Sequence, residues 1–288
     1  MYNIITAIIE MVKNPVLNIK EYTNTHNRAN SMGESLEEYI KNLFARVDSN
    51  TTESERMIKI SKCFSYTGNQ NNPPDAMIRG GDALEVKKIE KIGSSLALNS
   101  SYPKAKLFSS SSMISNACRT AEEWKEKDLI YAVGVITNSH LSALSFVYGM
   151  DYAASASVYE NTKNAVCEGI NSISNLEFSE TKELGRINRV DPLGLTYMRI
   201  RGMWGIENPF KVFSYIYQPD SQNRFNFMAI INKQKYESFR NTDELEKLAK
   251  SVNELNVSDV MIKNPDNPAQ LRKAKLITFF VGPEEKTT

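Results

Sequence analysis

Two apolar runs do most to constrain how this chain can fold. They extend from Leu129 to Ile136 and from Ala143 to Tyr148. Short apolar runs of this kind are typical of strands that lie in the middle of a sheet and are covered on both faces. The sequence therefore predicts a buried sheet as the centre of the molecule.

Segments on both sides of these runs have the periodicity of helices or strands. Residues 31–47 begin with Ser31 and Glu34 in capping-box spacing and then place apolar side chains on one helical stripe. Further helices are predicted at about 113–127, 155–173 and 242–255, strands at about 57–66, 75–90 and 274–281, and strands with loops over 182–232. The predicted fold class is α/β, with one mixed β-sheet flanked by helices.

The length of the chain fits one large α/β domain or two small ones. It has 288 residues, of which 41% are hydrophobic, as is ordinary for a protein with a buried core. The sequence shows no internal repeat, block of charge or long linker. The simplest organisation is a single domain over residues 1–288, with a core at about 31–180 and a C-terminal elaboration of strands and loops at about 181–288.

Charge and residue counts exclude several classes of site. The 35 Lys and Arg against 34 Asp and Glu give a net charge of +1, so any contact with nucleic acid must come from local clusters. The three cysteines, Cys63, Cys118 and Cys167, form no CxxC pair, which excludes a zinc knuckle and favours buried thiols. With only His26 and His140, the chemistry must rest on carboxylates and lysines.

The first twelve residues have an apolar face but do not resemble a targeting or membrane segment. They include Glu10, lack a basic leader and a small-residue cleavage site, and are too short to span a bilayer. We therefore expect a soluble protein of the cytoplasm that has no membrane association.

One short pattern predicts a metal-dependent phosphodiester hydrolase. Pro74-Asp75 is followed ten residues later by Glu85-Val86-Lys87. Hydrolysis of a phosphodiester requires a divalent cation on hard oxygen ligands, charge relief at the phosphate and a positioned water, which two carboxylates and a lysine can supply. Glu-x-Lys occurs four times, at 85/87, 123/125, 180/182 and 284/286, but only the first copy lies in an apolar strand shortly after a Pro-Asp.

The alternation of a strand tests this pattern. It places Glu85 and Lys87 on one face and Leu84 and Val86 on the other. For Asp75 to join the first face, we predict pairing of 79 with 83, 77 with 85 and 75 with 87 around a three-residue loop at 80–82, or a bulge with the same effect. A regular two-residue turn would exclude this arrangement.

The expected mechanism assigns a role to each residue. Asp75 and Glu85, with the backbone carbonyl of Val86, would hold Mg²⁺, while Lys87 would orient the attacking water and neutralise charge on the phosphate. Glu37, at the edge of the apolar stripe of the 31–47 helix, is a candidate second-metal or water-mediated ligand, whereas Glu34 and Glu38 are expected to face away. The alternatives are a surface Glu-Lys pair and an ordinary boundary carboxylate at Glu37.

The residues around this pattern resemble a known family. The segments GESLEEYIKNLF, NQNNPPDAMIRGGDALEVKKIE, SSLALNSSYPKAKL and GRINRVDPLGLTYMRIRGMW are similar to type II restriction endonucleases of the PD-(D/E)xK superfamily, in their NgoPII-type group. The resemblance implies a restriction-endonuclease-like fold and a homodimer that uses Mg²⁺ to cut both strands of a short palindrome in double-stranded DNA, GGCC in that group. It also implies a cognate DNA methyltransferase as functional partner.

The best local basic cluster in the chain predicts where bases are read. Guanine offers paired acceptors to an arginine fork in the major groove, so a G·C-rich site favours arginines. The candidates for DNA contact in this cluster are Arg186, Asn188, Arg189, Arg199 and Arg201. Lys104 and Lys106 follow the catalytic strand and are candidate phosphate contacts, with solvated loop lysines as the alternative. Asn99 and Tyr102 are candidates to position either the DNA backbone or the active-site loop. The alternative for any one arginine is a solvated side chain or a pair with Glu183 or Asp191.

Two other functions remain open at this point. A DNA-repair nuclease on the same scaffold would cut by DNA structure instead of by sequence. A non-catalytic DNA-binding protein would use Asp75, Glu85 and Lys87 only as a salt-bridged set on a hairpin.

Overall fold

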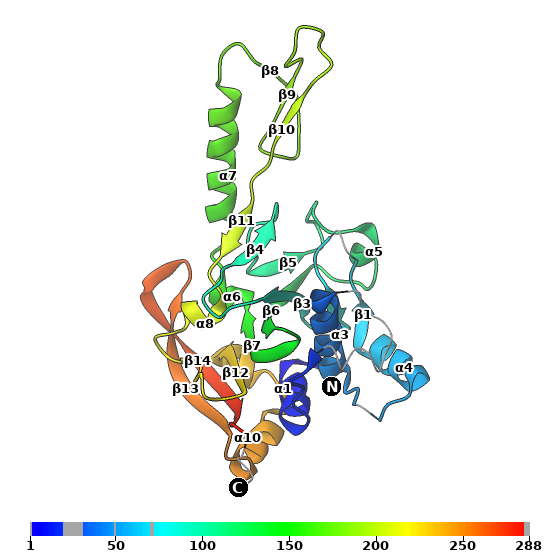
Figure 1. The fold of residues 1–288 in the computed structure, drawn as a ribbon, viewed down its shortest axis with the longest axis vertical. Coiled ribbons are helices and arrows are strands. Elements are labelled where there is room, and N and C mark those ends of the chain that lie inside the picture. The colour runs from blue at the N-terminus through cyan, green and yellow to red at the C-terminus, as the bar shows by residue number, and fades with distance from the viewer. Residues whose placement is uncertain (1, 20–30, 49, 70–71, 285–288) are drawn as a thin grey trace.

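A mixed β-sheet forms the centre of the computed structural model, which describes residues 2–19, 31–48, 50–69 and 72–284 (Figure 1). In this described part, nine strands form the sheet in the order β1-β2-β3-β6-β7-β12-β14-β13, with β5 paired to β6. They are β1 Phe64–Tyr66, β2 Ala76–Ile78, β3 Ala83–Ile89, β5 Lys106–Phe108, β6 Glu126–Thr137, β7 His140–Tyr148, β12 Phe225–Asn232, β13 Leu255–Asn264 and β14 Asn267–Val281. The predicted α/β class with one mixed sheet is confirmed.

The two apolar runs are the central strands β6 and β7. They pair as an antiparallel hairpin, while β3 runs parallel to β6 and β12 runs parallel to β7. Nearly every side chain of β6 and β7 is buried, because helices and loops cover both faces of the sheet. The strand that carries Glu85 and Lys87 therefore lies against the most buried part of the molecule.

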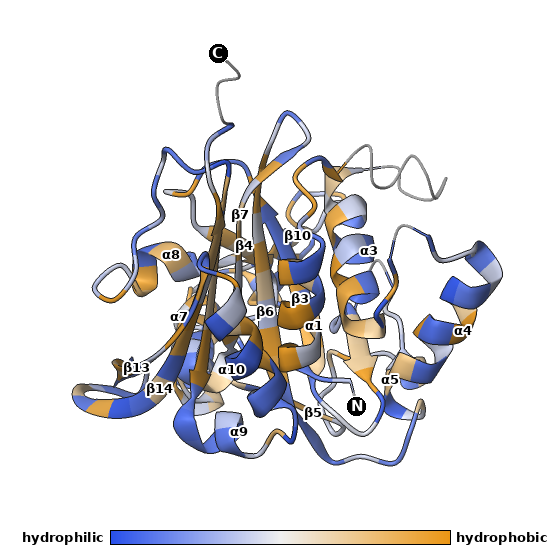
Figure 2. Ribbon diagram, turned by 90° about the horizontal axis from the view of Figure 1, so that it is seen from below, coloured by the Kyte–Doolittle hydropathy of each residue, from blue (hydrophilic) through white to orange (hydrophobic). Residues whose placement is uncertain are grey.

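Helices cover one face of the sheet (Figure 2). They are α1 Ile4–Lys13, α3 Met32–Ala45 and α10 Thr242–Ser251. Eight of the ten residues of α1 are buried, so the apolar start of the chain is a core helix. Among the described residues, no helix is long and apolar enough to cross a membrane. α3 confirms the predicted helix, with the Ser31 hydroxyl accepting a hydrogen bond from the backbone N–H of Glu34.

The strand expected over 57–66 is wrong. A helix, α4 Glu53–Cys63, occupies most of it, and only β1 is extended. The Thr52 and Glu55 capping box starts the helix, and Met57 and Ile58 are 61% and 52% exposed, so the apolar alternation does not mark a buried face.

The helix expected over 113–127 shrinks to a single turn, α5 Asn116–Arg119. Lys127 explains the extended chain that follows. Its buried Nζ donates to the backbone oxygens of Ile78 at 3.1 Å and Gly81 at 2.7 Å, which requires the strand geometry of β6. The helices expected at 155–173 and 242–255 are confirmed as α7 Ala156–Asn171 and α10, and the closing strand as β14.

An arm, defined here as residues 156–203, projects from the body of the molecule (Figure 1). It consists of α7 with the small sheet of β8 Glu177–Phe178, β9 Gly185–Asn188 and β10 Met198–Ile200. At its root, β11 Trp204–Ile206 pairs with β4 Leu96–Asn99. The central sheet draws strands from both sides of residue 181, and short helices α6 Gly149–Tyr152, α8 Pro209–Val212 and α9 Lys233–Glu237 complete the fold.

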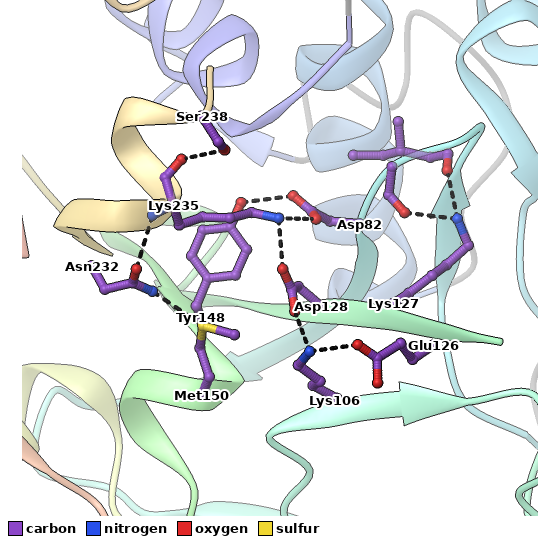
Figure 3. Close-up of polar contacts among 12 residues, drawn as sticks. Asp82, Lys106, Glu126, Lys127, Asp128, Tyr148, Met150, Asn232, Lys235 and Ser238 are labelled. Carbon is purple, nitrogen blue, oxygen red and sulfur yellow. Dashed lines mark hydrogen bonds and ion pairs between the residues drawn. The ribbon is translucent and has the colours of Figure 1, made fainter. Parts of the chain in front are cut away.

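A chain of ion pairs fixes the turn end of the β2–β3 hairpin to the body (Figure 3). Lys235 on α9 lies 2.7 Å from Asp82, at the start of β3, and 2.7 Å from Asp128 on β6. The hydroxyl of Tyr148 donates to the second oxygen of Asp82 at 2.7 Å. Lys106 extends the chain by pairing with Asp128 at 3.6 Å. These contacts anchor Asp82, which lies only three positions before Glu85, and so fix the start of β3.

Two of the three thiols are buried, as expected. Cys63 and Cys118 are buried in the two halves of the core, and burial raises the pKa of both thiols, to about 12 for Cys63 and about 11 for Cys118. Cys167 is only half-buried because it lies on α7, so the prediction for this residue is wrong.

Candidate active site

The β2–β3 hairpin places Asp75 beside the strand of Glu85 and Lys87, in a register that differs from the prediction. Ala76 pairs with Leu84 and Met77 with Ala83, so the three-residue loop is 79–81 and not 80–82. Gly80 has φ +62° in this loop, a left-handed conformation that glycine adopts readily, and this fixes the earlier turn. The shift is by two residues, so the parity that sets which face each side chain occupies is preserved.

The two faces of β3 separate as the alternation predicts. Leu84 and Val86 enter the core on the helix-covered face, whereas Ala83 and Ile89 enter the core on the opposite face. Glu85 and Lys87 share that opposite face, and they line a cavity of about 240 Å³ together with Asp75. The structure thus brings the three predicted catalytic residues into one cavity.

Short polar contacts connect these three residues. The Nζ of Lys87 lies 2.7 Å from Oε1 of Glu85. The backbone N–H of Val86 donates to Oδ2 of Asp75 at 2.6 Å. Since the N–H and C=O of one strand residue point to the same side, the carbonyl of Val86 is directed toward the edge where Asp75 lies.

The electrostatics of the cavity favour a bound cation. Burial, followed by repulsion from Glu85, raises the pKa of Asp75 to about 7. Burial alone would lower the pKa of Lys87, but attraction to Glu85 and Asp75 outweighs it, and the net pKa is raised. A buried carboxylate that holds its proton so firmly is one whose negative charge lacks compensation.

The residues present fit a hard divalent cation that keeps part of its water shell. No group of three or more His, Cys, Asp or Glu side chains within the described ranges forms a complete metal cage. Mg²⁺ is commonly bound by only one or two carboxylates, with water and substrate phosphate completing its shell. Asp75, Glu85 and the Val86 carbonyl match that donor set.

Glu37 lies near the cavity but is not among the residues that line it. It forms an ion pair with Lys41 on α3, and its charge contributes to raising the pKa of both Asp75 and Lys87. Glu38, expected to face away, is instead buried and lies 3.1 Å from Arg56. That prediction is wrong because Arg56 of α4 packs back onto α3 and supplies a buried partner charge.

A second lysine, Lys104, lines the same cavity. The backbone N–H of Lys104 donates to the Tyr131 hydroxyl at 2.7 Å, and the Nζ of Lys104 donates to the Ser101 hydroxyl. Burial lowers the pKa of Lys104, and Glu85 partly opposes that shift. Lys106, expected to act alongside Lys104, lies elsewhere and is paired with Glu126 at 2.7 Å.

Asn99 and Tyr102 also line the cavity, on the segment that leads to Lys104. Asn99 ends β4 in a left-handed conformation with φ +53°. The Tyr102 hydroxyl donates to Glu160 of α7 at 2.7 Å, and its ring stacks on Tyr159 at 5.4 Å. Sequence reasoning missed the Tyr131 hydroxyl, which bonds the backbone of Lys104, because a tyrosine within an apolar run is expected to be a core residue.

The predicted base-reading cluster lies on the arm, away from the cavity, and most of its charge is already paired. Arg199 bonds Glu183 through two nitrogens at 2.8 and 2.7 Å, and Arg201 pairs with the same carboxylate. Both arginines therefore follow the alternative given for this cluster, a pair with Glu183. Of the remaining members, Arg186 lies over the ring of Tyr197 at 4.5 Å, Arg189 lies 3.5 Å from Glu177, and Asn188 pairs with Glu177 across β8 and β9.

The other Glu-x-Lys copies do not form a comparable site. Glu123 and Lys125 are exposed, as are Glu180 and Lys182. The copy at 284/286 includes Lys286, which lies outside the described residues, as does His26. Placement beside Asp75 separates the 85/87 copy from the rest.

Similar sequences show the family to which this chain belongs. The type II restriction enzyme NgoPII of Neisseria gonorrhoeae is 55% identical over 280 residues, which cover 97% of this chain and 100% of that relative. No solved structure gives a match. The family model described as NgoPII restriction endonuclease matches residues 2–263. The chain, with its restriction-endonuclease-like sheet and its carboxylate and lysine cavity, belongs to the NgoPII restriction endonuclease family.

Proposed function

We propose that this type II restriction endonuclease uses Mg²⁺ to hydrolyse both strands of a short palindromic site in double-stranded DNA, G·C-rich and similar to GGCC. The observation that carries the proposal is that Asp75, Glu85 and Lys87 line one cavity of about 240 Å³. The catalytic unit would be a homodimer, since a palindrome presents the same sequence to two copies related by a twofold axis. A cognate methyltransferase would protect host DNA, and the enzyme would act in the cytoplasm, where entering DNA is found.

Each residue of the cavity has a distinct task in this proposal. Asp75, Glu85 and the Val86 carbonyl would hold Mg²⁺, which when bound acidifies a coordinated water and neutralises charge at the scissile phosphate. Lys87, held by Glu85 at 2.7 Å, would orient the attacking water and stabilise the charge that develops on the phosphate oxygens. Glu37 would order water at the rim of the cavity.

The DNA contacts divide between the cavity and the arm. Lys104, Asn99 and Tyr102 line the cavity and would contact the backbone beside the scissile bond, while Lys106 would first have to leave its pairs with Glu126 and Asp128. The arm residues would reach base edges only by exchanging their present partners for guanine: Arg186, Asn188, Arg189, Arg199 and Arg201.

The test is digestion of a long unmethylated DNA with and without Mg²⁺, followed by mapping of the ends. We expect discrete fragments that require the metal, and the end sequences then give the site and the cut position. Smears or cuts confined to branched DNA would support a repair nuclease. Binding without cleavage under all conditions would support a non-catalytic protein.

A further inference from the structure

The arm carries a share of exposed apolar side chains far above its length. Within the described residues, nineteen large hydrophobic side chains are exposed, and ten of them lie on the arm. Leu193 and Leu195, at 81% and 78% exposed, stand out in the loop between β9 and β10. The full set is Val158, Val166, Ile173, Leu176, Val190, Leu193, Leu195, Tyr197, Met198 and Met203. Exposed apolar side chains concentrated on one projecting segment are typical of an interaction site.

The helix of the arm is not covered by the body. None of the sixteen residues of α7 is buried among the described residues. One side of the helix packs on the hairpin, where a Cβ on Gly185 would come within 2.9 Å of the Ile170 side chain. Isolated helices of this length are only marginally stable in water, so a second covering surface is needed.

The uncovered side of α7 is itself patterned. Val158 and Val166 are exposed and lie about 80° apart around α7, and the exposed Ile173 and Leu176 follow after the helix ends at Asn171. Ile170, whose side chain meets Gly185 of the hairpin, lies about 40° beyond Val166 around the helix. The hairpin therefore covers the neighbouring side of α7 and leaves Val158 and Val166 49% and 42% exposed.

The net charge of the arm argues against DNA as the partner of its apolar side chains, as distinct from the arginines that are proposed to read bases. Residues 156–203 contain six Lys and Arg and six Asp and Glu, for a net charge of zero. Three of the arginines pair with arm carboxylates: Arg189 with Glu177, and Arg199 and Arg201 with Glu183. A surface that binds a polyanion needs uncompensated positive charge, whereas a neutral apolar surface fits a protein.

The root of the arm lies beside the catalytic cavity. Tyr102, which lines the cavity, is hydrogen-bonded to Glu160 at 2.7 Å and stacked on Tyr159, both at the start of α7. The Trp204 ring packs edge-on against Tyr159 at 5.7 Å and leads into β11, which pairs with the active-site strand β4. A protein bound along the arm would therefore stand next to the cavity.

We propose that the exposed apolar side chains of α7, of the turn that follows it and of the β9–β10 loop form the interface with the arm of a second copy of this chain. The inference deepens the proposed function and rests on it, because two copies joined beside their cavities can address both strands of one palindrome. Ten side chains that are 42–81% exposed offer on the order of 800 Å² per copy, the area that a specific interface takes from each partner.

Sedimentation of the full chain without DNA tests the interface. We expect the wild type to be a dimer, the variant V166E/I173E to dissociate at least tenfold more readily, and L193D/L195D to do the same. M57E/I58E, which places the same charges on exposed residues of α4, is the matched control and should stay a dimer. A wild-type monomer at micromolar concentration, or an arm variant that dimerises as the wild type does, overturns the proposal.

Two further measurements keep the result unambiguous. In a Cys167→Ser background, Val166→Cys should form a cross-linked dimer with a short bismaleimide, and Met57→Cys should not. This test does not depend on the charged variants, so a failure of those variants to fold cannot decide the outcome. Cleavage by the wild type is scored separately: cutting by a monomer overturns the interface and the homodimeric catalytic unit but leaves the proposed cleavage of DNA standing, and a dimer that never cuts overturns only the proposed cleavage. An arm variant that stays dimeric but loses DNA binding assigns the surface to DNA.

Discussion

The backbone N–H of Val86 and Oδ2 of Asp75 are joined by a hydrogen bond of 2.6 Å across the hairpin. This bond fixes the carboxylate beside Glu85 even though burial and repulsion from that neighbour raise the pKa of Asp75 to about 7. The protein therefore holds a carboxylate in a position that disfavours its charge. Such strain is expected where a cation completes the site.

Replacing Asp75 with asparagine should abolish cleavage and stabilise the metal-free protein at alkaline pH. The pKa of Asp75 is raised from 3.8 to about 7 in the folded state, so folding takes up a proton between these values. Stability is therefore lost as pH rises from about 4 to 7, and Asp75→Asn escapes this loss. In thermal unfolding at pH 8 without metal, Asp75→Asn should have a Tm a few degrees above that of the wild type. If the wild type had the same Tm at pH 8 as at pH 5, the raised pKa of Asp75 would be contradicted.

Removing the amine of Lys87 should slow cleavage without preventing DNA binding. The Nζ, 2.7 Å from Glu85, is placed to stabilise charge on the phosphate, and loss of one such donor costs about 10²–10³ in rate. Lys87→Ala should lower the single-turnover rate by that factor with a Kd for the DNA site within a few fold of wild type. Lys88→Ala, on the opposite face of β3, is the control and should cut normally. Equal rates for the two variants would contradict a catalytic role.

The sequence predicted the parts of the fold that depend on local periodicity. The central strands, α3, α7 and the closing strand follow from apolar patterns that neighbouring elements reinforce. It failed where a distant contact decides the conformation. Residues 113–127 are mostly not helical because the buried Lys127 binds the hairpin turn, and no local pattern reports a partner more than forty residues away.

The candidate site was predictable in its residue types but not in its surroundings. Parity alone was enough to place Asp75 with Glu85 and Lys87, so a register error of two residues did no harm. The pairing of the arm arginines and the burial of Glu38 were not predictable, because both depend on which side chains the fold brings within a few ångströms.

Lys104 and Lys106 should separate in their effect on cleavage although they are two residues apart. Lys104 lines the cavity, while Lys106 is paired with Glu126 and Asp128 outside it. Lys104→Ala should reduce kcat/KM on the DNA site by about 10- to 100-fold, which corresponds to one strong charge-assisted contact. Lys106→Ala should change it by less than about threefold. Equal losses would show that both lysines act on DNA only through general charge.

Loss of Lys235 should destabilise the protein more than loss of an exposed neighbour on the same helix. Its Nζ lies 2.7 Å from both Asp82 and Asp128, and Lys235→Met leaves those largely buried carboxylates short of a partner, a change that costs about 3–5 kcal/mol. Lys233→Met, whose pair with Glu237 is exposed, should cost less than about 0.5 kcal/mol. Urea unfolding of both variants measures the difference.

A double variant then shows whether the unpaired charge is the cause. Lys235→Met combined with Asp82→Asn removes the amine and also one of the two carboxylates that it neutralises. The double variant should be more stable, by about 1–3 kcal/mol, than the sum of the two single effects predicts, because substitutions of contacting residues in one network do not have additive effects. Strict additivity would mean that Lys235 stabilises the hairpin through its cation–π contact with the Tyr148 ring, whose centroid lies 5.1 Å from Nζ, and not through its ion pair with Asp82.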